Sequence, residues 1–209
     1  MAVVDCTDIV RTVSRSFGDT AKIFIVDADY LDFINAGQLK IARETECLTT
    51  TVTPAATSFP YALPTDFLKV KRVVYGQIPL PYVDIEDLDA KGQSLTDRNT
   101  PQFYFFYDEK ISLFPLQQTT DSTVVTIAYA TIPAEVTSIA DPITIPQRYT
   151  EDLHNFCLAR AHERNENYRA QENVEAKLEN SLAKGREDQY EQDDTYPVVR
   201  DDPLDNWMW

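Results

Sequence analysis

The sequence predicts an α+β fold: a helical domain formed by N- and C-terminal helices, with an inserted small antiparallel β-sandwich or barrel domain and an extended C-terminal tail. Apolar residues recur at helical spacing near both ends of the 209-residue chain. The stretch between them is rich in Thr, Val, Tyr, Phe and Pro, and the final stretch is acidic. We therefore expect helices in 1–47 and 146–185, the β domain in 48–145 and the tail in 186–209.

Two helices are expected before the β domain. Within 4–17, Ile9, Val13 and Phe17 follow at four-residue steps, and Gly18 ends the run as a glycine cap would. Asp27 is a favourable N-cap for a second helix over 28–43. The apolar stripe of this helix consists of Leu31, Ile34, Gln38 and Ile41.

The β domain begins where Pro60 and Pro64 prevent a helix from continuing. Short β-rich runs predict strands over 68–75, 102–107, 111–114 and 124–130. In the first run Leu68, Val70 and Val74 are expected on one face, opposite Lys69 and Lys71. The segment 108–110 is expected to form a hairpin turn.

Two further helices are expected after Pro146. Their apolar stripes are Leu153, Phe156, Cys157 and Ala161, then Val174, Leu178 and Leu182, with a break at 165–167. The tail after Gly185 has a formal charge of −6 and cannot form a core of its own.

The composition disfavours several classes of partner and site, namely nucleic acids, zinc and membranes. The formal net charge is −15, from 34 acidic and 19 basic residues, which disfavours a surface that grips phosphates. Three cysteines without CxxC spacing suggest neither a disulfide framework nor a zinc site. The sequence has neither a signal-peptide pattern nor about 18 consecutive apolar residues, so we expect no export signal and no membrane association.

No residue set predicts catalysis, and we expect no enzyme activity, cofactor or metal ion. His154 and His162 are eight residues apart on one helix, whereas helical metal pairs are four apart. The acidic run 27–32 lacks the central glycine of a calcium loop and serves a helix start better. Cys157 belongs to an apolar stripe, which favours a packed thiol over a nucleophile.

Two regions are candidates for protein contacts. The strand 102–107 has aromatic residues on both faces, and Phe103, Tyr104 and Phe106 are its interface candidates. The acidic tail ends in an apolar group that a partner could bury. Its docking candidates are Asp201, Asp202, Asp205, Trp207, Met208 and Trp209.

Seven segments, in order, carry a family resemblance. They are DADYLDFINAGQ (27–38), LPTDFLKV (63–70), TPQFY (100–104), ISLFP (111–115), IAY (127–129), IPQRY (145–149) and LARA (158–161). No segment is diagnostic alone, but together their order and spacing resemble the bacteriophage head-to-tail connector, or portal adaptor, family.

The resemblance implies a structural virion protein, made in the host bacterial cytoplasm and located at the portal–tail junction. It implies a homo-oligomeric ring, a dodecamer, that joins the portal protein to the tail nozzle protein. Phage DNA would pass through its channel during ejection without sequence-specific binding. The tail ending in Trp209 is not part of the resemblance, so its target stays open between portal, neighbouring subunit and nozzle.

Two other classes remain open from the residues themselves. A β-sandwich module that binds a glycan or receptor on a helical stalk would use exposed aromatics such as Tyr104. A hydrolase would need paired carboxylates in a pocket. The dense candidates are Asp84, Glu86, Asp87 and Asp89, which are expected to form a solvated loop.

Overall fold

The computed structural model describes residues 5–54, 59–90, 94, 98–118, 120 and 123–193, with side chains of the last helix described to Glu187. By its internal contacts the chain divides between Thr45 and Glu46 and again between Ala134 and Glu135. Helices from both sides of the insertion form one unit, and the inserted segment forms the other. The predicted α+β class, with terminal helices packed together and antiparallel sheets inserted, is confirmed.

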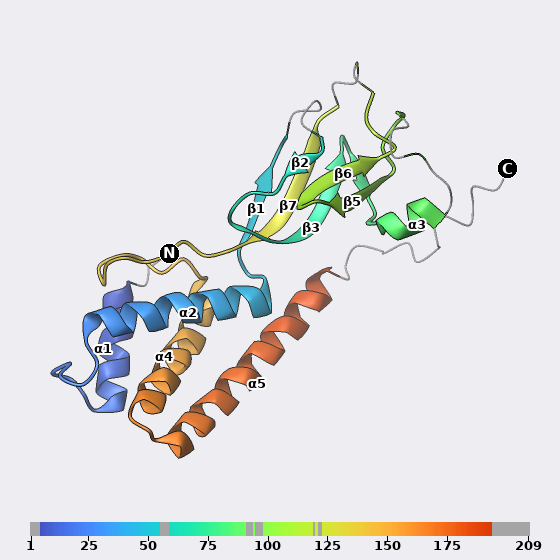
Figure 1. Cartoon of the computed structure of the whole chain (residues 1–209). Helices are drawn as coiled ribbons and strands as arrows, with labels where there is room; N and C mark the ends of the chain where they lie inside the picture. The colour runs from blue at the N-terminus through green and yellow to red at the C-terminus, as the bar shows by residue number, and fades with distance from the viewer. Residues whose placement is uncertain are drawn as a thin grey trace. The chain divides into compact units, whose positions relative to one another are not determined.

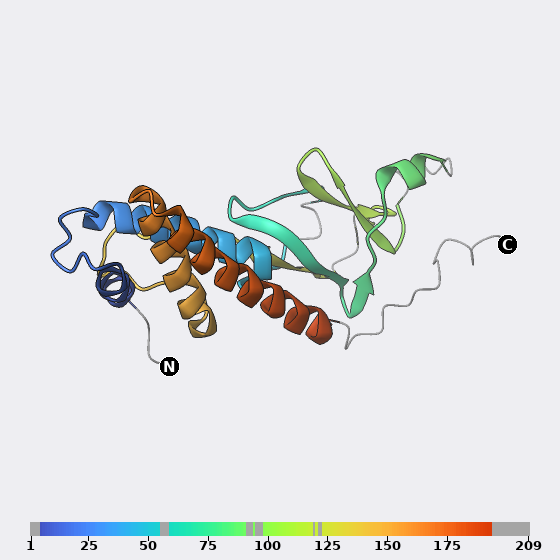
Figure 2. The same cartoon turned by 90° about the horizontal axis from the view of Figure 1, so that it is seen from below.

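Four helices build the helical unit. They are α1 (Cys6–Phe17), α2 (Asp27–Thr45), α4 (Thr150–Arg164) and α5 (Tyr168–Asp193), with a short 3-10 helix, η2 (Gln147–Tyr149), before α4. Helices α2 and α4 each contact the three other helices, and the contacts of α4 are the more extensive (Figures 1 and 2). Buried apolar side chains at the predicted spacing include Ile9, Val13, Ile34, Ile41, Leu153, Leu178 and Leu182.

The two helix ends near residues 18 and 27 differ in how well they were predicted. Gly18 has a φ of 90° and returns its N–H to the carbonyls of Ser14 and Arg15, as a glycine cap should. Asp27 is not the N-cap of α2 but its first helical residue. The N–H of Val26 instead donates to the Asp29 carboxylate at 3.1 Å, because a carboxylate three residues into a helix can reach back to the cap.

The last helix is longer than predicted. Helix α5 continues through Gly185 to Asp193, so the extended tail does not begin at residue 186. One helical glycine costs only about 1 kcal/mol, and the following Arg, Glu and Gln residues favour helix. Arg186 also forms an ion pair with Glu44 of α2. Residues 194–209 lie outside the described part of the chain.

The inserted unit consists of two antiparallel sheets. The strands are β1 (Thr49–Val52), β2 (Tyr61–Ala62), β3 (Phe67–Tyr75), β4 (Ile78–Leu80), β5 (Phe103–Tyr107), β6 (Lys110–Phe114) and β7 (Val125–Thr131). Their order is β1-β7-β3-β4 in one sheet and β2-β6-β5 in the other (Figure 1). Val73 and Ile127 of the first sheet share a buried cluster with Ile111 and Leu113 of the second, so the sheets pack face to face.

Strand β3 departs from the predicted alternation. Val73 and Tyr75 are buried, whereas Val74 is not, so its predicted place on the buried face is wrong. The pairing with β7 shifts register between Val70 and Arg72. A bulge adds one residue on one strand and changes the phase of the alternation, which the sequence period alone does not reveal.

The hairpin between β5 and β6 is confirmed. Asp108 and Glu109 both have positive φ, 51° and 56°, and connect Tyr107 to its pairing partner Lys110. Positive φ at both central residues defines a type I′ turn, whose twist matches the flanking strands.

Glu46 provides a testable pH dependence in the β unit. Burial acts to raise the pKa of its carboxyl, but hydrogen bonds from Lys69, at 2.7 Å, and Lys71 outweigh this, so the pKa lies below its usual value. A lowered folded-state pKa stabilises the fold above the unfolded pKa, about 4.3, and this stabilisation is lost as pH falls through the folded value.

We expect Glu46→Gln to lower the free energy of unfolding by about 1 kcal/mol at pH 7. The difference from wild type should shrink below about pH 4.3, because the wild-type carboxylate is then also neutralised. Urea denaturation at a series of pH values measures it. A difference that does not change with pH would contradict the assigned ion pairs.

Candidate interaction surfaces

The two histidines of α4 lie against α1 rather than around a shared centre. The Nε2 atom of His154 is 3.5 Å from the Ser16 hydroxyl. The ring of His162 packs edge-on against Phe17, with centroids 5.4 Å apart. Within the described ranges, no group of three His, Cys, Asp or Glu residues is placed to hold a metal ion. The contacts of His154 and His162 are therefore contacts between helices and not those of a metal site.

Cys157, the cysteine that could have been a nucleophile, is a buried thiol, and so is Cys6 beside it in the helical unit. Cys6 and Cys157 are both inaccessible to solvent. Burial raises the pKa of Cys6 to about 11 and moves the pKa of Cys157 further in the same direction. Because the thiolate is the reactive form, neither thiol has the environment of a nucleophile.

Acidic residues at the start of α2 have structural partners. Asp27 pairs with Lys22 at 2.6 Å, and Asp29 pairs with Arg164 of α4 at 2.5 Å. The hydrogen bond from Arg164 holds the pKa of Asp29 below its usual value. These carboxylates fix the loop and the α2–α4 contact.

The carboxylates expected in a solvated loop form a short helix instead. Helix α3 (Ile85–Ala90) begins after Asp84, whose carboxylate accepts the N–H of Glu86 at 3.3 Å. Leu88 is buried and anchors the helix to the β unit. The loop prediction is therefore wrong, because a local cap and one buried leucine suffice for about one and a half turns.

The aromatic residues of β5 lie mostly inside the β unit. Phe103 is buried, and Tyr104 and Phe106 are half-buried against the core cluster. Burial also raises the pKa of Tyr104. The predicted interface role of these residues stays a prediction, and Tyr104, which the glycan-binding alternative would use as an exposed aromatic, is half-buried. The exposed aromatics nearby are Tyr82 and Tyr107, the latter 62% exposed.

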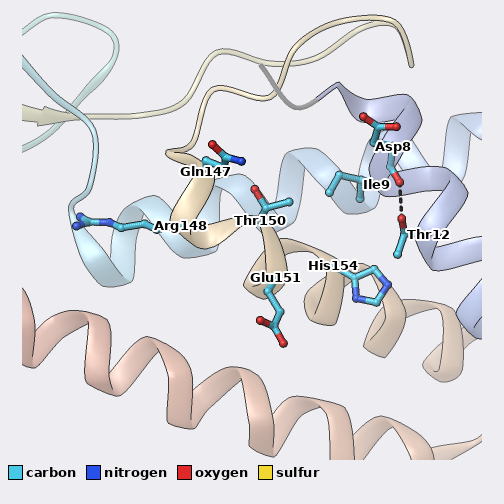
Figure 3. A pocket seen from close by; sticks show the side chains of 8 residues that line it. All are labelled: Asp8, Ile9, Thr12, Gln147, Arg148, Thr150, Glu151 and His154. Atoms are coloured by element: carbon cyan, nitrogen blue, oxygen red, sulfur yellow. Dashed lines mark hydrogen bonds between the residues drawn. The ribbon is translucent and has the colours of Figure 1, made fainter. Parts of the chain in front are cut away.

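A pocket lies between α1 and the start of α4, and we call it the α1–α4 pocket (Figure 3). Its volume is about 480 Å³. Its lining residues are Asp8, Ile9, Thr12, Gln147, Arg148, Thr150, Glu151 and His154. Pockets of roughly 300–1,000 Å³ accommodate small ligands or a few side chains of a partner.

The polar groups of the pocket are only partly engaged. The Thr12 hydroxyl donates to the carbonyl of Asp8 at 2.8 Å (Figure 3). Burial lowers the pKa of His154 below its usual value, so its ring is neutral at pH 7. The buried hydroxyl oxygen of Thr150 has no hydrogen-bond partner in the described structure. The pocket lining therefore combines neutral polar groups with three charged side chains, those of Asp8, Arg148 and Glu151.

A second surface was missed from the sequence. The loop between α1 and α2 exposes three apolar side chains, which we call the α1–α2 tip: Ile23, Phe24 and Val26. Asp19 accepts backbone hydrogen bonds from the loop that carries them. An apolar run between Asp19 and Asp27 was the available signal, but its exposure depends on the loop conformation.

The tail candidates Asp201, Asp202, Asp205, Trp207, Met208 and Trp209 lie outside the described residues. Among the helices that are described, none is both long and apolar enough to cross a membrane.

The chain was compared with models of known protein families. The model of the SU10 adaptor protein family matches residues 4–201, nearly the whole chain. The chain belongs to the SU10 adaptor protein family. SU10 adaptor proteins are structural adaptors of phage virions and not an enzyme family, and the predicted resemblance to phage adaptors is thereby confirmed. A search of curated proteins found no match.

Membership of the SU10 adaptor family explains why the chain exposes apolar side chains. An adaptor works by binding other virion proteins, so exposed apolar groups such as Ile23 are expected on it. The family match ends at Asp201, and the terminal Trp-Met-Trp group lies beyond it.

Proposed function

We propose that this SU10-family chain forms a twelve-subunit ring that joins the portal of a tailed phage capsid to the tail nozzle. The match of the family model to residues 4–201 is the observation that carries the proposal. The ring would be part of the DNA channel and would act by contact alone, without a cofactor.

The charge of the chain supports a channel role. Twelve copies with a formal charge of −15 each would carry about −180. Carboxylates facing the channel repel DNA phosphates, so DNA would pass during ejection without being held.

Assembly on the portal tests this function. We expect the purified chain, mixed with portal rings, to form a larger ring-shaped particle whose added mass equals a whole number of subunits, twelve being expected. Helices α1 and α4 are too short to be stable in isolation, which favours assembly that depends on a partner. Native mass spectrometry and electron microscopy measure the mass and shape. A chain that stays monomeric beside intact portal rings would contradict the proposal.

The acidic tail would strengthen attachment. We propose that Trp207, Met208 and Trp209 dock onto the portal or a neighbouring subunit, while Asp201, Asp202 and Asp205 meet basic groups there. The aromatic side chains would supply the burial, and the aspartates would steer the encounter.

Deleting 206–209 is expected to weaken binding to portal rings by roughly a hundredfold or more, because each indole contributes about 2 kcal/mol when fully buried. The deleted chain should keep its helical circular dichroism signal. As the matched control, Asp201→Asn, Asp202→Asn and Asp205→Asn together should mainly reduce the salt dependence of the association rate. If the deletion unfolds the subunit, the tail belongs to its own core and docking is wrong.

A further inference from the structure

The α1–α2 tip is unusually apolar for an exposed loop. Ile23 is 84% exposed, Phe24 45% and Val26 51%, whereas Ile25 between them is fully buried. The buried side chain of Ile25 anchors the loop, and its neighbours are turned outward as a result. Contiguous exposed apolar groups of this kind mark a contact with another protein.

The tip is held in shape before any partner binds. The carboxylate of Asp19 accepts the N–H groups of Ile23, Phe24 and Ile25 at 3.0, 2.9 and 3.0 Å. The ring of Phe24 also stacks on Phe17, with centroids 6.1 Å apart. An ordered loop loses little conformational entropy on binding, so burial of its apolar surface contributes more fully to the binding free energy.

The tip and the α1–α4 pocket lie at different ends of α1. Asp8 and Ile9 of the pocket belong to the first half of α1 and Thr12 lies at its middle, whereas the tip follows its last residue, Phe17. In Figures 1 and 2 this loop projects beyond the helices of the unit. At 1.5 Å per residue, Ile9 and Phe17 are about 12 Å apart along the helix. Since Asp19 holds the loop at the far end of α1, the tip cannot reach the pocket of its own chain.

We propose that the α1–α2 tip of one copy inserts Ile23 and Phe24 into the α1–α4 pocket of the next copy. The inference names the subunit contact within the ring proposed above and rests on that function. The pocket has a volume of about 480 Å³, and although Asp8, Arg148 and Glu151 are among its lining residues, most of its accessible lining surface is apolar. It therefore has room and apolar surface for two apolar side chains. Because tip and pocket are different surfaces, the contact is head-to-tail, and such a contact closes a ring when the rotation between successive copies adds up to a full turn.

One pair of opposite charges can meet across the proposed contact, although the pocket is also lined by Asp8 and Arg148. Lys22 precedes the tip, and its ammonium group is shared only with Asp27 among the described residues. Glu151 is one of the two carboxylate residues that line the pocket, the other being Asp8. An ammonium group has three donors, so Lys22 can keep Asp27 and also reach Glu151 of the neighbouring copy.

A disulfide test locates the contact. The variant Ile23→Cys with Thr12→Cys, in a Cys47→Ser background, places one thiol on the tip and one at the pocket; native Cys6 and Cys157 are fully buried. We expect oxidation to give a ladder of covalent multimers, both in rings assembled on the portal and in concentrated free protein. Either introduced cysteine alone should give at least tenfold less product. The matched control replaces Ile23→Cys with Ile78→Cys, an exposed isoleucine of the β unit.

Each outcome of the disulfide test either supports or overturns the proposed contact between tip and pocket. Portal-bound rings without the 12–23 disulfide would overturn it and leave the adaptor function standing. If the chain does not bind the portal at all, the proposed function fails, and the ladder in concentrated free protein decides the contact alone: its presence supports the contact and its absence overturns it.

Two complementary variants test the head-to-tail direction. Ile23→Asp should disable the tip and Thr12→Trp should fill the pocket, and both positions are exposed, so the helical signal should be retained. Each variant alone should lose at least nine-tenths of the assembled product. A mixture should stop at a one-to-one pair, because only one intact tip and one intact pocket remain to meet. Complete rings from either variant or from the mixture would overturn the proposal.

Discussion

Replacing Leu113 with alanine is expected to lower the free energy of unfolding of the β unit by about 2–5 kcal/mol. Leu113 on β6 is fully buried, and it shares the core cluster with Val73 and Ile127 of the other sheet. Truncation removes apolar contacts between the sheets and leaves a cavity that two hydrogen-bonded layers cannot close. A typical domain is stable by only about 5–15 kcal/mol, so the loss should be visible in any denaturation experiment.

Tyr107→Ala is the matched control for Leu113→Ala. Tyr107 belongs to the same hairpin but is 62% exposed, so its truncation should change stability by less than about 0.5 kcal/mol. Both tryptophans stand in the last three residues, so circular dichroism and tyrosine fluorescence are the suitable signals for urea titrations. Equal effects of the two substitutions would contradict the packing of the two sheets.

The helices could be predicted because their signals are local. Ile9 and Val13, and later Leu178 and Leu182, are four residues apart and buried as their spacing indicates. The C-cap at Gly18 is equally local, because only the residue itself must adopt a positive φ. The end of α5 was mispredicted because a single Gly185 was given more weight than the helix-forming residues after it.

The β unit was predicted in type but not in detail, since its pairing is non-local. Strand β2 has only two residues and exists because Tyr61 pairs with Ile111, fifty residues later. Strand β1 likewise depends on β7, where Thr49 pairs with Ala130. Neither strand is long enough to show a periodic pattern of apolar residues, so the sequence could not reveal β1 or β2.

The candidate surfaces were the least predictable part. The α1–α4 pocket joins Ile9 to His154, which are far apart in the sequence and meet only after α1 packs on α4. The exposure of Ile23 depends on a loop conformation that the Asp19 carboxylate fixes. The periodic pattern of apolar residues in a sequence shows neither which helices pack together nor which conformation a loop adopts. Family resemblance, which samples the order of many segments, identified the adaptor class where single motifs did not.

Gly37→Ala is expected to destabilise the helical unit by about 1 kcal/mol, and Gly37→Val by about 3 kcal/mol or more. In an isolated helix the alanine change would stabilise by about 1 kcal/mol. Here a Cβ atom at residue 37 would lie 2.6 Å from Leu153 Cδ1 and 2.8 Å from Phe156 Cδ1 of α4. Both side chains are buried, so they cannot swing into solvent, and α2 would have to move away from α4.

Gly185→Ala is the matched control for Gly37→Ala, because it is expected to change the stability in the opposite direction. The added Cβ atom would lie 3.4 Å from the ring of Tyr149 and 3.6 Å from the methyl group of Thr45, which is ordinary contact. With no displacement required, the gain in helix propensity should remain, and the variant should be more stable by up to about 1 kcal/mol. Urea denaturation of the two variants beside wild type measures both shifts. If Gly37→Ala stabilised the chain as Gly185→Ala does, the close approach of α2 to α4 would be wrong, and with it the placement of α4 that shapes the α1–α4 pocket.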